Sequence, residues 1–270
     1  MLGDPVEPLG ETDLQIGDLH LRLSAPKDID ALLDHAIETA PSDVDAIPYY
    51  AWLWPSARAL AEYLWEIRSC LRGARTLELG CGLGLPTLVA ALLGADATAS
   101  DFHPGVRPWV ERNFLLNNAS ARYQPYDWND AYLPEQTLLS AEPPYAYLLG
   151  SDLLYEKRHI PALVQALARN LAPGGQALIA DPGRDNLQLF LDTLQKARWQ
   201  HHLIVRGDIW IVRCTPWISP PCRPGSPPWP SGRGTWWCSP PPPMPARSPT
   251  NCCPTSRSRR RGAAPWRCRR

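Results

Sequence analysis

From Arg75 to Arg213, short apolar runs alternate along the chain with segments whose apolar residues recur every three or four positions. The short runs predict β-strands, and the periodic segments predict helices with one apolar face. Strands are expected at 76–79, 97–100, 121–126, 145–150, 176–180, 200–205 and 209–213, and helices at 86–93, 105–117, 160–170 and 186–197. Strands that alternate with helices of this length predict a parallel sheet covered by helices on both faces.

Ahead of this region the pattern predicts one strand and two helices. Residues 14–23 end in alternating leucines, which indicates a single half-buried strand. Residues 27–39 are expected to form a polar helix. A second helix is expected to begin at Pro55, a residue suited to the first helical turn, and to extend to Gly73. It is preceded by a cluster of aromatic side chains, Tyr49, Tyr50, Trp52 and Trp54.

The composition changes abruptly at Thr215. Residues 215–270 contain fifteen Pro, ten Arg, five Trp and five Cys, but no Leu, Val, Asp, Glu or Lys. Such a segment cannot bury enough apolar surface to offset the entropy of ordering it. We interpret it as a disordered Pro/Arg-rich tail. It is either a basic interaction segment or, as we prefer, the out-of-frame translation of a GC-rich gene end.

The charge of the remaining chain argues against several classes of partner. Residues 1–214 carry 17 basic and 27 acidic side chains, a net charge of −10, which is unsuited to binding the phosphates of nucleic acid. The N-terminus lacks the features of a secretory signal, and no apolar stretch is long enough to cross a bilayer. Cys70, Cys81 and Cys214, the cysteines ahead of the tail, show no pairing or metal-ligand pattern. We expect a cytoplasmic protein without a metal, acting on a neutral or basic partner.

The strongest chemical signal is Thr76-Leu-Glu-Leu-Gly-Cys-Gly-Leu-Gly84, in which an apolar strand leads into three alternating glycines. Glycines there let the backbone approach a ligand and allow a tight turn with positive φ. The ligand would lie at the carboxyl edge of the first strand. The Gly-x-Gly-x-x-Gly pattern of a dinucleotide site does not fit, because Leu85 and Thr87 occupy the place of the third glycine.

Polar side chains also follow the next three strands of the expected sheet. Asp101 ends the second strand, where an acidic side chain can accept hydrogen bonds from two ribose hydroxyls. Asp127 and Trp128 end the third strand, where an indole can lie against a purine. Ser151 and Asp152 end the fourth, at the mouth of the sheet, although each also suits a helix N-cap. The sequence therefore predicts one site at this edge.

These motifs resemble those of the seven-β-strand protein-lysine methyltransferases, the group that includes the electron-transfer-flavoprotein β-subunit lysine methyltransferase. Bacterial relatives are often labelled predicted nicotinamide N-methylases. The resemblance covers residues 45–213 and consists of Trp54-Pro-Ser-Ala, Leu77-Glu-Leu-Gly-Cys-Gly-Leu-Gly84, Asp127-Trp128, Ser151-Asp-Leu-Leu-Tyr155 and Asp181-Pro-Gly-Arg184. It implies a Rossmann-like, doubly wound α/β fold with a seven-stranded sheet, and S-adenosyl-L-methionine as cofactor.

The resemblance also implies a role for each matching residue. It assigns Asp152 and Tyr155 to catalysis on the acceptor side. It places the cofactor against Trp54, Glu78, Gly80, Cys81, Gly82, Gly84, Asp101, Asp127, Trp128 and Ser151. The expected domains are an N-terminal extension that covers the substrate side (1–50), the methyltransferase domain (51–214) and the tail (215–270).

The expected activity is methylation of lysine in a protein substrate by a monomeric enzyme. Two alternatives remain, a methyltransferase for small amines such as nicotinamide and a catalytically silent module that binds a partner. The intact glycines, Asp101 and Asp152 argue against the silent module. For a lysine acceptor we expect Asp152 to orient the ammonium before it loses a proton. The channel that would receive it is expected to be formed by Tyr49, Tyr50, Trp52 and Tyr155.

Overall fold

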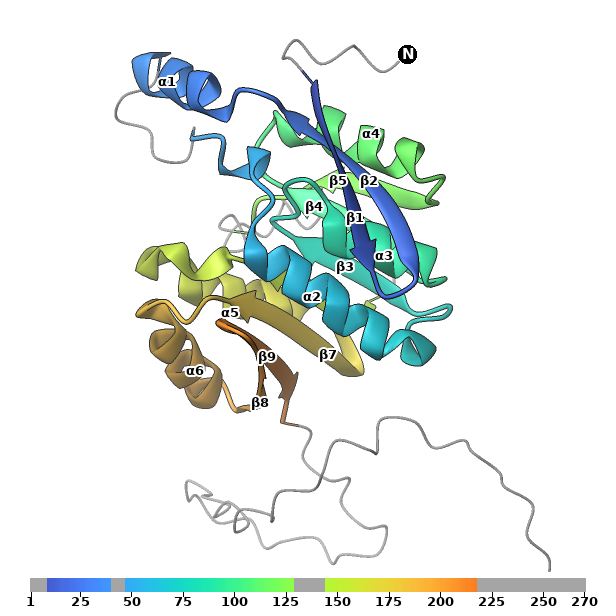
Figure 1. The fold of residues 1–270 in the computed structure, drawn as a ribbon. Helices are drawn as coiled ribbons and strands as arrows, with labels where there is room; N and C mark the ends of the chain where they lie inside the picture. Colours follow the sequence, from blue (N-terminus) through green and yellow to red (C-terminus); the bar gives the residue numbers. More distant parts are fainter. Residues whose placement is uncertain (1–8, 40–46, 129–143, 218–270) are drawn as a thin grey trace, which may run out of the picture. The chain divides into compact units, whose positions relative to one another are not determined.

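The central sheet brings the carboxyl ends of five parallel strands to one edge (Figure 1). The computed structural model describes residues 9–39, 47–128 and 144–217. Its strands are β3 (Arg75–Leu79), β4 (Asp96–Asp101), β5 (Ala121–Pro125), β6 (Tyr145–Ser151), β7 (Leu171–Asp181), β8 (Trp199–Arg206) and β9 (Ile209–Pro216). They form a seven-stranded sheet in the order β5-β4-β3-β6-β7-β9-β8, in which β9 runs antiparallel to both neighbours. The predicted fold class is confirmed.

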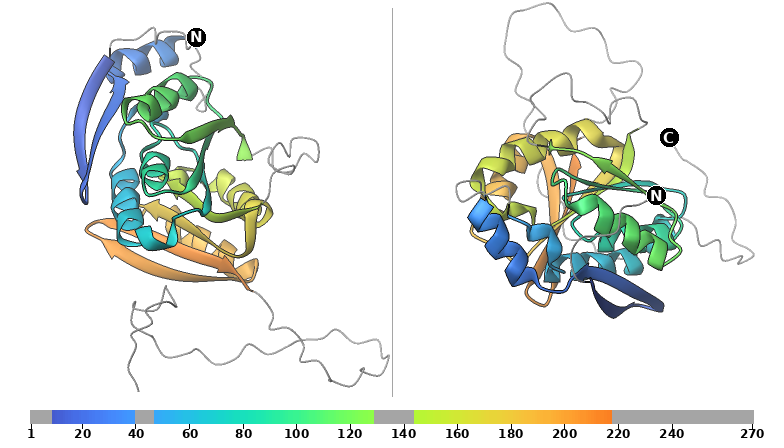
Figure 2. Two further views of the ribbon diagram at one scale, coloured as in Figure 1. Left: turned by 90° about the vertical axis from the view of Figure 1, so that its right-hand side faces the viewer. Right: turned by 90° about the horizontal axis from the view of Figure 1, so that it is seen from above.

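Helices cover both faces of this sheet (Figure 2). The helices that follow the N-terminal hairpin are α1 (Ile29–Thr39), α2 (Pro55–Glu66), α3 (Leu85–Leu92), α4 (Val106–Leu116), α5 (Ile160–Asn170) and α6 (Asn186–Lys196). Leucines of α2 and α3 pack with Leu149 and Leu178 in one buried cluster. On the other face, apolar residues of α5 and α6 pack with Leu77 and Leu79. Strand side chains alternate between the faces, so the sheet contributes to both clusters.

The N-terminal region forms a hairpin rather than the single strand expected at 14–23. Strands β1 (Leu9–Ile16) and β2 (Leu19–Pro26) pair antiparallel, with Ile16 opposite Leu19. The prediction was wrong because Gly17, with φ of 61°, adopts the left-handed conformation that a two-residue hairpin turn requires. The buried Asn113 amide of α4 holds this hairpin: it bonds the backbone N–H and C=O of Ser24 and also donates to the carbonyl of Leu83, in the glycine turn.

Helix α2 is shorter than expected, because it ends at Glu66 rather than reaching Gly73. Ile67 leaves the helical conformation, and a 3₁₀ turn at Arg68–Cys70 follows. Leu71 is still fully buried, so the tighter turn keeps the apolar stripe on the core without a continuous α-helix.

All described residues belong to one compact unit, into which the hairpin is bonded. Within them, β9 continues to Pro216, two residues into the tail predicted at 215–270, and residues 218–270 lie outside the described part. The boundaries 1–50, 51–214 and 215–270 stay a prediction. No helix among the described residues is long and apolar enough to span a membrane.

Candidate functional site

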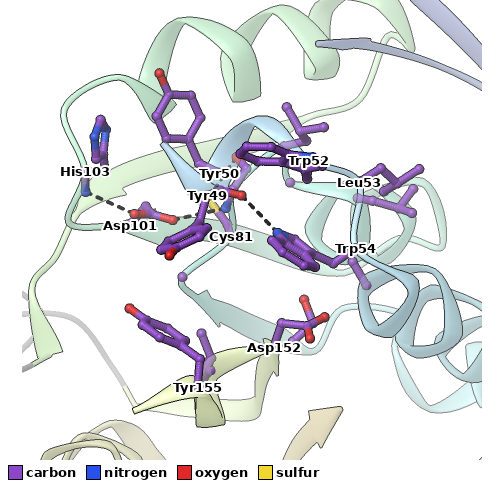
Figure 3. A pocket seen from close by; sticks show the side chains of 18 of the residues that line it. Tyr49, Tyr50, Trp52, Leu53, Trp54, Cys81, Asp101, His103, Asp152 and Tyr155 are labelled. Carbon is purple, nitrogen blue, oxygen red and sulfur yellow. Dashed lines mark hydrogen bonds between the residues drawn. The ribbon is translucent and has the colours of Figure 1, made fainter. Parts of the chain in front are cut away.

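A cavity of about 380 Å³ lies at the carboxyl edge of β3, β4 and β6 (Figure 3). Six segments of the chain line it: the chain leading into α2, the glycine turn after β3, the residues after β4, Trp128 after β5, the residues after β6, and Arg184 after β7. Among the predicted site residues that line it are Trp54, Gly80, Cys81, Gly82, Gly84, Asp101, Trp128, Ser151, Asp152 and Tyr155. The structure therefore brings nearly all of the predicted residues together.

The glycine turn adopts a backbone that other residues rarely reach. Gly80, Gly82 and Gly84 all have positive φ, at 57°, 50° and 77°. A Cβ added to Gly80 would lie 2.6 Å from the side chain of Leu153 in the loop after β6. The glycine is thus required by the close packing of two loops of the site as well as by the turn itself.

Asp101 closes the glycine turn from the end of β4. Its Oδ2 accepts a hydrogen bond from the backbone N–H of Gly82 at 3.1 Å, and its Oδ1 accepts one from His103 N–H at 3.0 Å. The carboxylate is buried, and this desolvation raises its pKa, while the two backbone hydrogen bonds oppose the rise. Each oxygen retains a lone pair for a further donor, so Asp101 can accept from a ligand's hydroxyls.

Two predicted cofactor residues, Glu78 and Asp127, are not among the residues that line the cavity. Glu78 is fully buried beneath the start of α3, where its Oε2 accepts hydrogen bonds from the N–H and the hydroxyl of Thr87 at 2.9 and 2.5 Å. Burial raises its pKa to about 8, against the lowering effect of those bonds. In this structure Glu78 ties β3 to the helix that follows the glycine turn.

Asp152 lies at the other side of the cavity, after β6. Its φ of 59° is unusual for a residue other than glycine, and its side chain is only 9% exposed. Its Oδ1 lies 2.7 Å from Nη2 of Arg184. Desolvation raises the pKa of Asp152, whereas the Ser56 hydroxyl and the Arg184 guanidinium lower it.

Aromatic rings connect the two sides of the cavity. Ring centroids are 6.1 Å apart between Tyr49 and Tyr155, 6.4 Å between Tyr49 and Trp54, and 6.1 Å between Trp52 and Trp54. The Trp54 indole N–H donates to the Tyr49 carbonyl at 2.9 Å, which fixes this wall. Tyr50 also lines the cavity but packs against His103, at 4.6 Å, near Asp101. Three of the four residues expected in the acceptor channel thus form one connected aromatic wall with Trp54, and the fourth is at the Asp101 end.

Several cavity residues were not predicted from the sequence. They are Ile47, Leu53, Ala57, Leu83, Leu85, Phe102, His103, Leu153, Glu156 and Arg184. Phe102 and His103 directly follow Asp101, and Arg184 ends the Asp-Pro-Gly-Arg motif after β7, so their positions in the sequence could have indicated them. Among the described residues, no cluster of His, Cys, Asp and Glu could hold a metal ion.

Residues 49–197 match the family model described as lysine methyltransferase. The chain belongs to this family. The match contains both sides of the cavity, from Tyr49 to Arg184. The prediction of an S-adenosylmethionine-dependent methyltransferase is therefore confirmed at the level of the family.

Curated relatives include enzymes with different named targets. The chain is 31% identical over 140 residues to an electron transfer flavoprotein beta subunit lysine methyltransferase from Xenopus laevis, covering 51% of this chain and 53% of that one. It is 32% identical to the protein N-lysine methyltransferase METTL21A of Danio rerio (50% and 62% covered) and 31% to the histone-arginine methyltransferase METTL23 of Rattus norvegicus (47% and 56%). The matches thus span about half to three-fifths of the relatives' length.

The fold is shared with a solved methyltransferase. The T. thermophilus 16S rRNA N2 G1207 methyltransferase RsmC, in complex with AdoMet and guanosine, matches with a TM-score of 0.56 at 16% identity. The match covers 79% of this chain and 52% of that one. At this identity the likeness supports the fold alone.

Proposed function

We propose that this protein is an S-adenosylmethionine-dependent methyltransferase that methylates lysine side chains of a protein substrate. The observation that carries the proposal is the division of one cavity into two chemically different sides. Asp101 and the glycine turn form one side, Asp152 and Tyr155 form the other, and the Tyr49 ring packs against Tyr155 from across the cavity (Figure 3). The sequence motifs fit a small-amine methyltransferase equally well. The lysate experiment below distinguishes the two activities.

The residues of the first side suit S-adenosylmethionine. The positive-φ glycines leave backbone without side chains at the cavity wall, and the Asp101 carboxylate retains acceptor capacity for the two hydroxyls of a ribose. The buried Trp128 follows β5 and lines the cavity. Its indole offers an aromatic surface for a purine. When bound, the cofactor supplies an activated methyl group, so the protein needs no nucleophile of its own.

The second side suits an amine that must lose a proton. Free lysine has a pKa of about 10.4, so roughly one molecule in a thousand is neutral at pH 7.4. The rings of Tyr49, Trp54 and Tyr155 form an apolar wall, and an amine bound against it would be partly desolvated, which favours its neutral form. The Asp152 carboxylate can hold the incoming ammonium, orient it and accept its proton. The residues thus position the acceptor amine and lower the free-energy cost of deprotonating it.

The net charge of the chain and its cysteines support an intracellular protein substrate. The acidic balance of residues 1–214 complements a basic, lysine-bearing segment. Cys70, Cys81 and Cys214 form no disulfide among the described residues, and we place the enzyme in the cytoplasm. We propose that the enzyme acts there as a monomer.

Replacing Asp101 by Ala should weaken cofactor binding and leave the fold intact. The loss of a buried acceptor for ligand hydroxyls is expected to cost about 1–3 kcal/mol of binding free energy. Calorimetric titration of S-adenosylhomocysteine into the wild-type and variant proteins measures this. An unchanged affinity would remove Asp101 from the cofactor site.

The decisive test of the substrate class uses a lysate as the source of acceptors. The purified chain and methyl-labelled S-adenosylmethionine are incubated with a lysate, and labelled products are separated by size. We expect a labelled protein band, absent with a Gly82→Trp variant, whose side chain would fill the glycine turn beside Tyr50. Label found only in small molecules would replace the proposal by the small-amine alternative.

A further inference from the structure

Arg184 lines the cavity and joins carboxylates that come from two adjacent strands. Its Nη2 lies 2.7 Å from Oδ1 of Asp152, after β6, and its Nη1 donates to Oδ2 of Asp181, the last residue of β7, at 2.9 Å. The Arg184 side chain is 29% exposed. A planar guanidinium can serve two carboxylates at once in this way, whereas an ammonium acts as a point charge.

Asp181 is the fixed end of this bridge. Its side chain is fully buried, and its Oδ1 accepts hydrogen bonds from the backbone N–H groups of Gly183 at 2.9 Å and Arg184 at 2.8 Å. Gly183 has a φ of 82°, so the turn depends on a glycine. The Asp-Pro-Gly-Arg turn therefore folds back on its own aspartate and directs the guanidinium toward Asp152.

Asp152 is the end that faces the cavity. Its backbone N–H donates to the Ala180 carbonyl at 2.9 Å, which anchors it to β7. Arg184 holds Oδ1, and the second oxygen, Oδ2, is buried beside the Ser56 hydroxyl, so neighbouring side chains fix the orientation of the carboxylate. As a lining residue, Asp152 still places a carboxylate at the cavity wall, where it favours a cationic ligand.

We propose that Arg184 is a positioning residue for the acceptor, holding the Asp152 carboxylate against Asp181 at the acceptor side of the cavity. This inference rests on the proposed function. One guanidinium between two carboxylates leaves a net negative charge, so the cluster still attracts a cationic amine. Arg184 also lowers the pKa of Asp152 against the effect of burial, which favours the ionised carboxylate.

A double-mutant cycle on the full chain tests the inference. Initial rates of methyl transfer are compared for the wild type, Arg184→Gln, Asp152→Asn and the double variant, at saturating cofactor. We expect Arg184→Gln to lower the rate at least tenfold, and the double variant to lie within threefold of Asp152→Asn. An arginine that acts through Asp152 has nothing left to position once that carboxylate is gone. Losses that multiply in the double variant would overturn the inference.

Two further measurements separate positioning from a general structural role. Arg184→Gln should bind S-adenosylhomocysteine within threefold of the wild type; a tenfold loss would assign Arg184 to the cofactor and overturn the inference. Arg184→Lys should recover part of the rate, and it replaces Arg184→Gln in the cycle if the latter does not fold.

Arg206→Gln is the matched control, because Arg206 pairs with Glu66 outside the cavity. We expect its rate to stay within threefold.

The failure of the proposed function would be recognised separately. If the wild-type chain labels no protein but labels small amines, the protein substrate is wrong, and the same cycle is run with the small amine as acceptor. Non-multiplying losses would then still support Arg184 as the residue that positions Asp152, and multiplying losses would overturn it.

Discussion

Replacing Asp152 by Asn is expected to lower the methyl-transfer rate by about 10²–10⁴-fold, the range for loss of a group that assists proton transfer. The amide keeps the size of the side chain but removes both the charge that holds the acceptor ammonium and the base that accepts its proton. Affinity for S-adenosylhomocysteine should stay within about threefold, which is less than 1 kcal/mol. Tyr155→Phe, which removes only a hydroxyl at the same wall, should also lower the rate and spare cofactor affinity.

The pH dependence of this variant discriminates between roles. The loss should be smaller at high pH than at neutral pH, because a higher pH supplies neutral lysine without help from the enzyme. Asp208→Asn, in the exposed turn between β8 and β9, is the matched control and should leave the profile unchanged. Equal losses at every pH would indicate misplacement of the amine. A collapse of cofactor affinity with normal saturated turnover would move Asp152 to the cofactor side.

Replacing Glu78 by Gln is expected to abolish a large pH dependence of stability. Burial raises the pKa of Glu78 to about 8 in the folded protein, from an ordinary value of 4.5 for an exposed glutamate. The unfolded chain therefore releases this proton at lower pH, so the free energy of unfolding falls as pH rises from about 4.5 to about 8. Between pH 5 and pH 8 this group should remove about 3 kcal/mol, at ~1.4 kcal/mol per pKa unit.

Urea unfolding of the full chain at pH 5 and pH 8 measures this effect. The Gln variant keeps an oxygen for Thr87 and has no charge to bury, so its stability relative to the wild type should be higher at pH 8 than at pH 5. Glu62→Gln is the control, since Glu62 forms an exposed pair with Arg58 on α2. Parallel changes in wild type and Glu78→Gln would show that Glu78 is ionised in the folded protein.

The sequence predicted those parts of the site whose functional residues directly follow a strand. The apolar runs that form β3, β4 and β6 stop at Gly80, Asp101 and Ser151, and parallel strands place those ends together. The pattern thus carries both the sheet and the position of its functional edge. It missed the turn at Gly17, because Leu14 and Ile16 before the glycine and the alternating leucines after it look like a single strand.

Other features depend on side-chain direction and on contacts between distant segments. Leu77 and Leu79 pack with α5 and α6, so Glu78 between them points to the opposite face, where Thr87 takes up its carboxylate beneath α3. Its place beside the glycine motif suggested a ligand contact that the cavity does not include. The role of Arg184 could not be predicted either, because it follows from a bridge between Asp152 and Asp181 on two different strands.

The identity of the modified residue tests the central claim most directly. The protein labelled in the lysate is hydrolysed to amino acids, and the labelled methylated residue is identified by chromatography against standards. Relatives of this chain include one named for histone arginine as well as those named for lysine, so the result is informative within the family. The account predicts label in Nε-methylated lysine. Label in methylarginine or methylhistidine would contradict it.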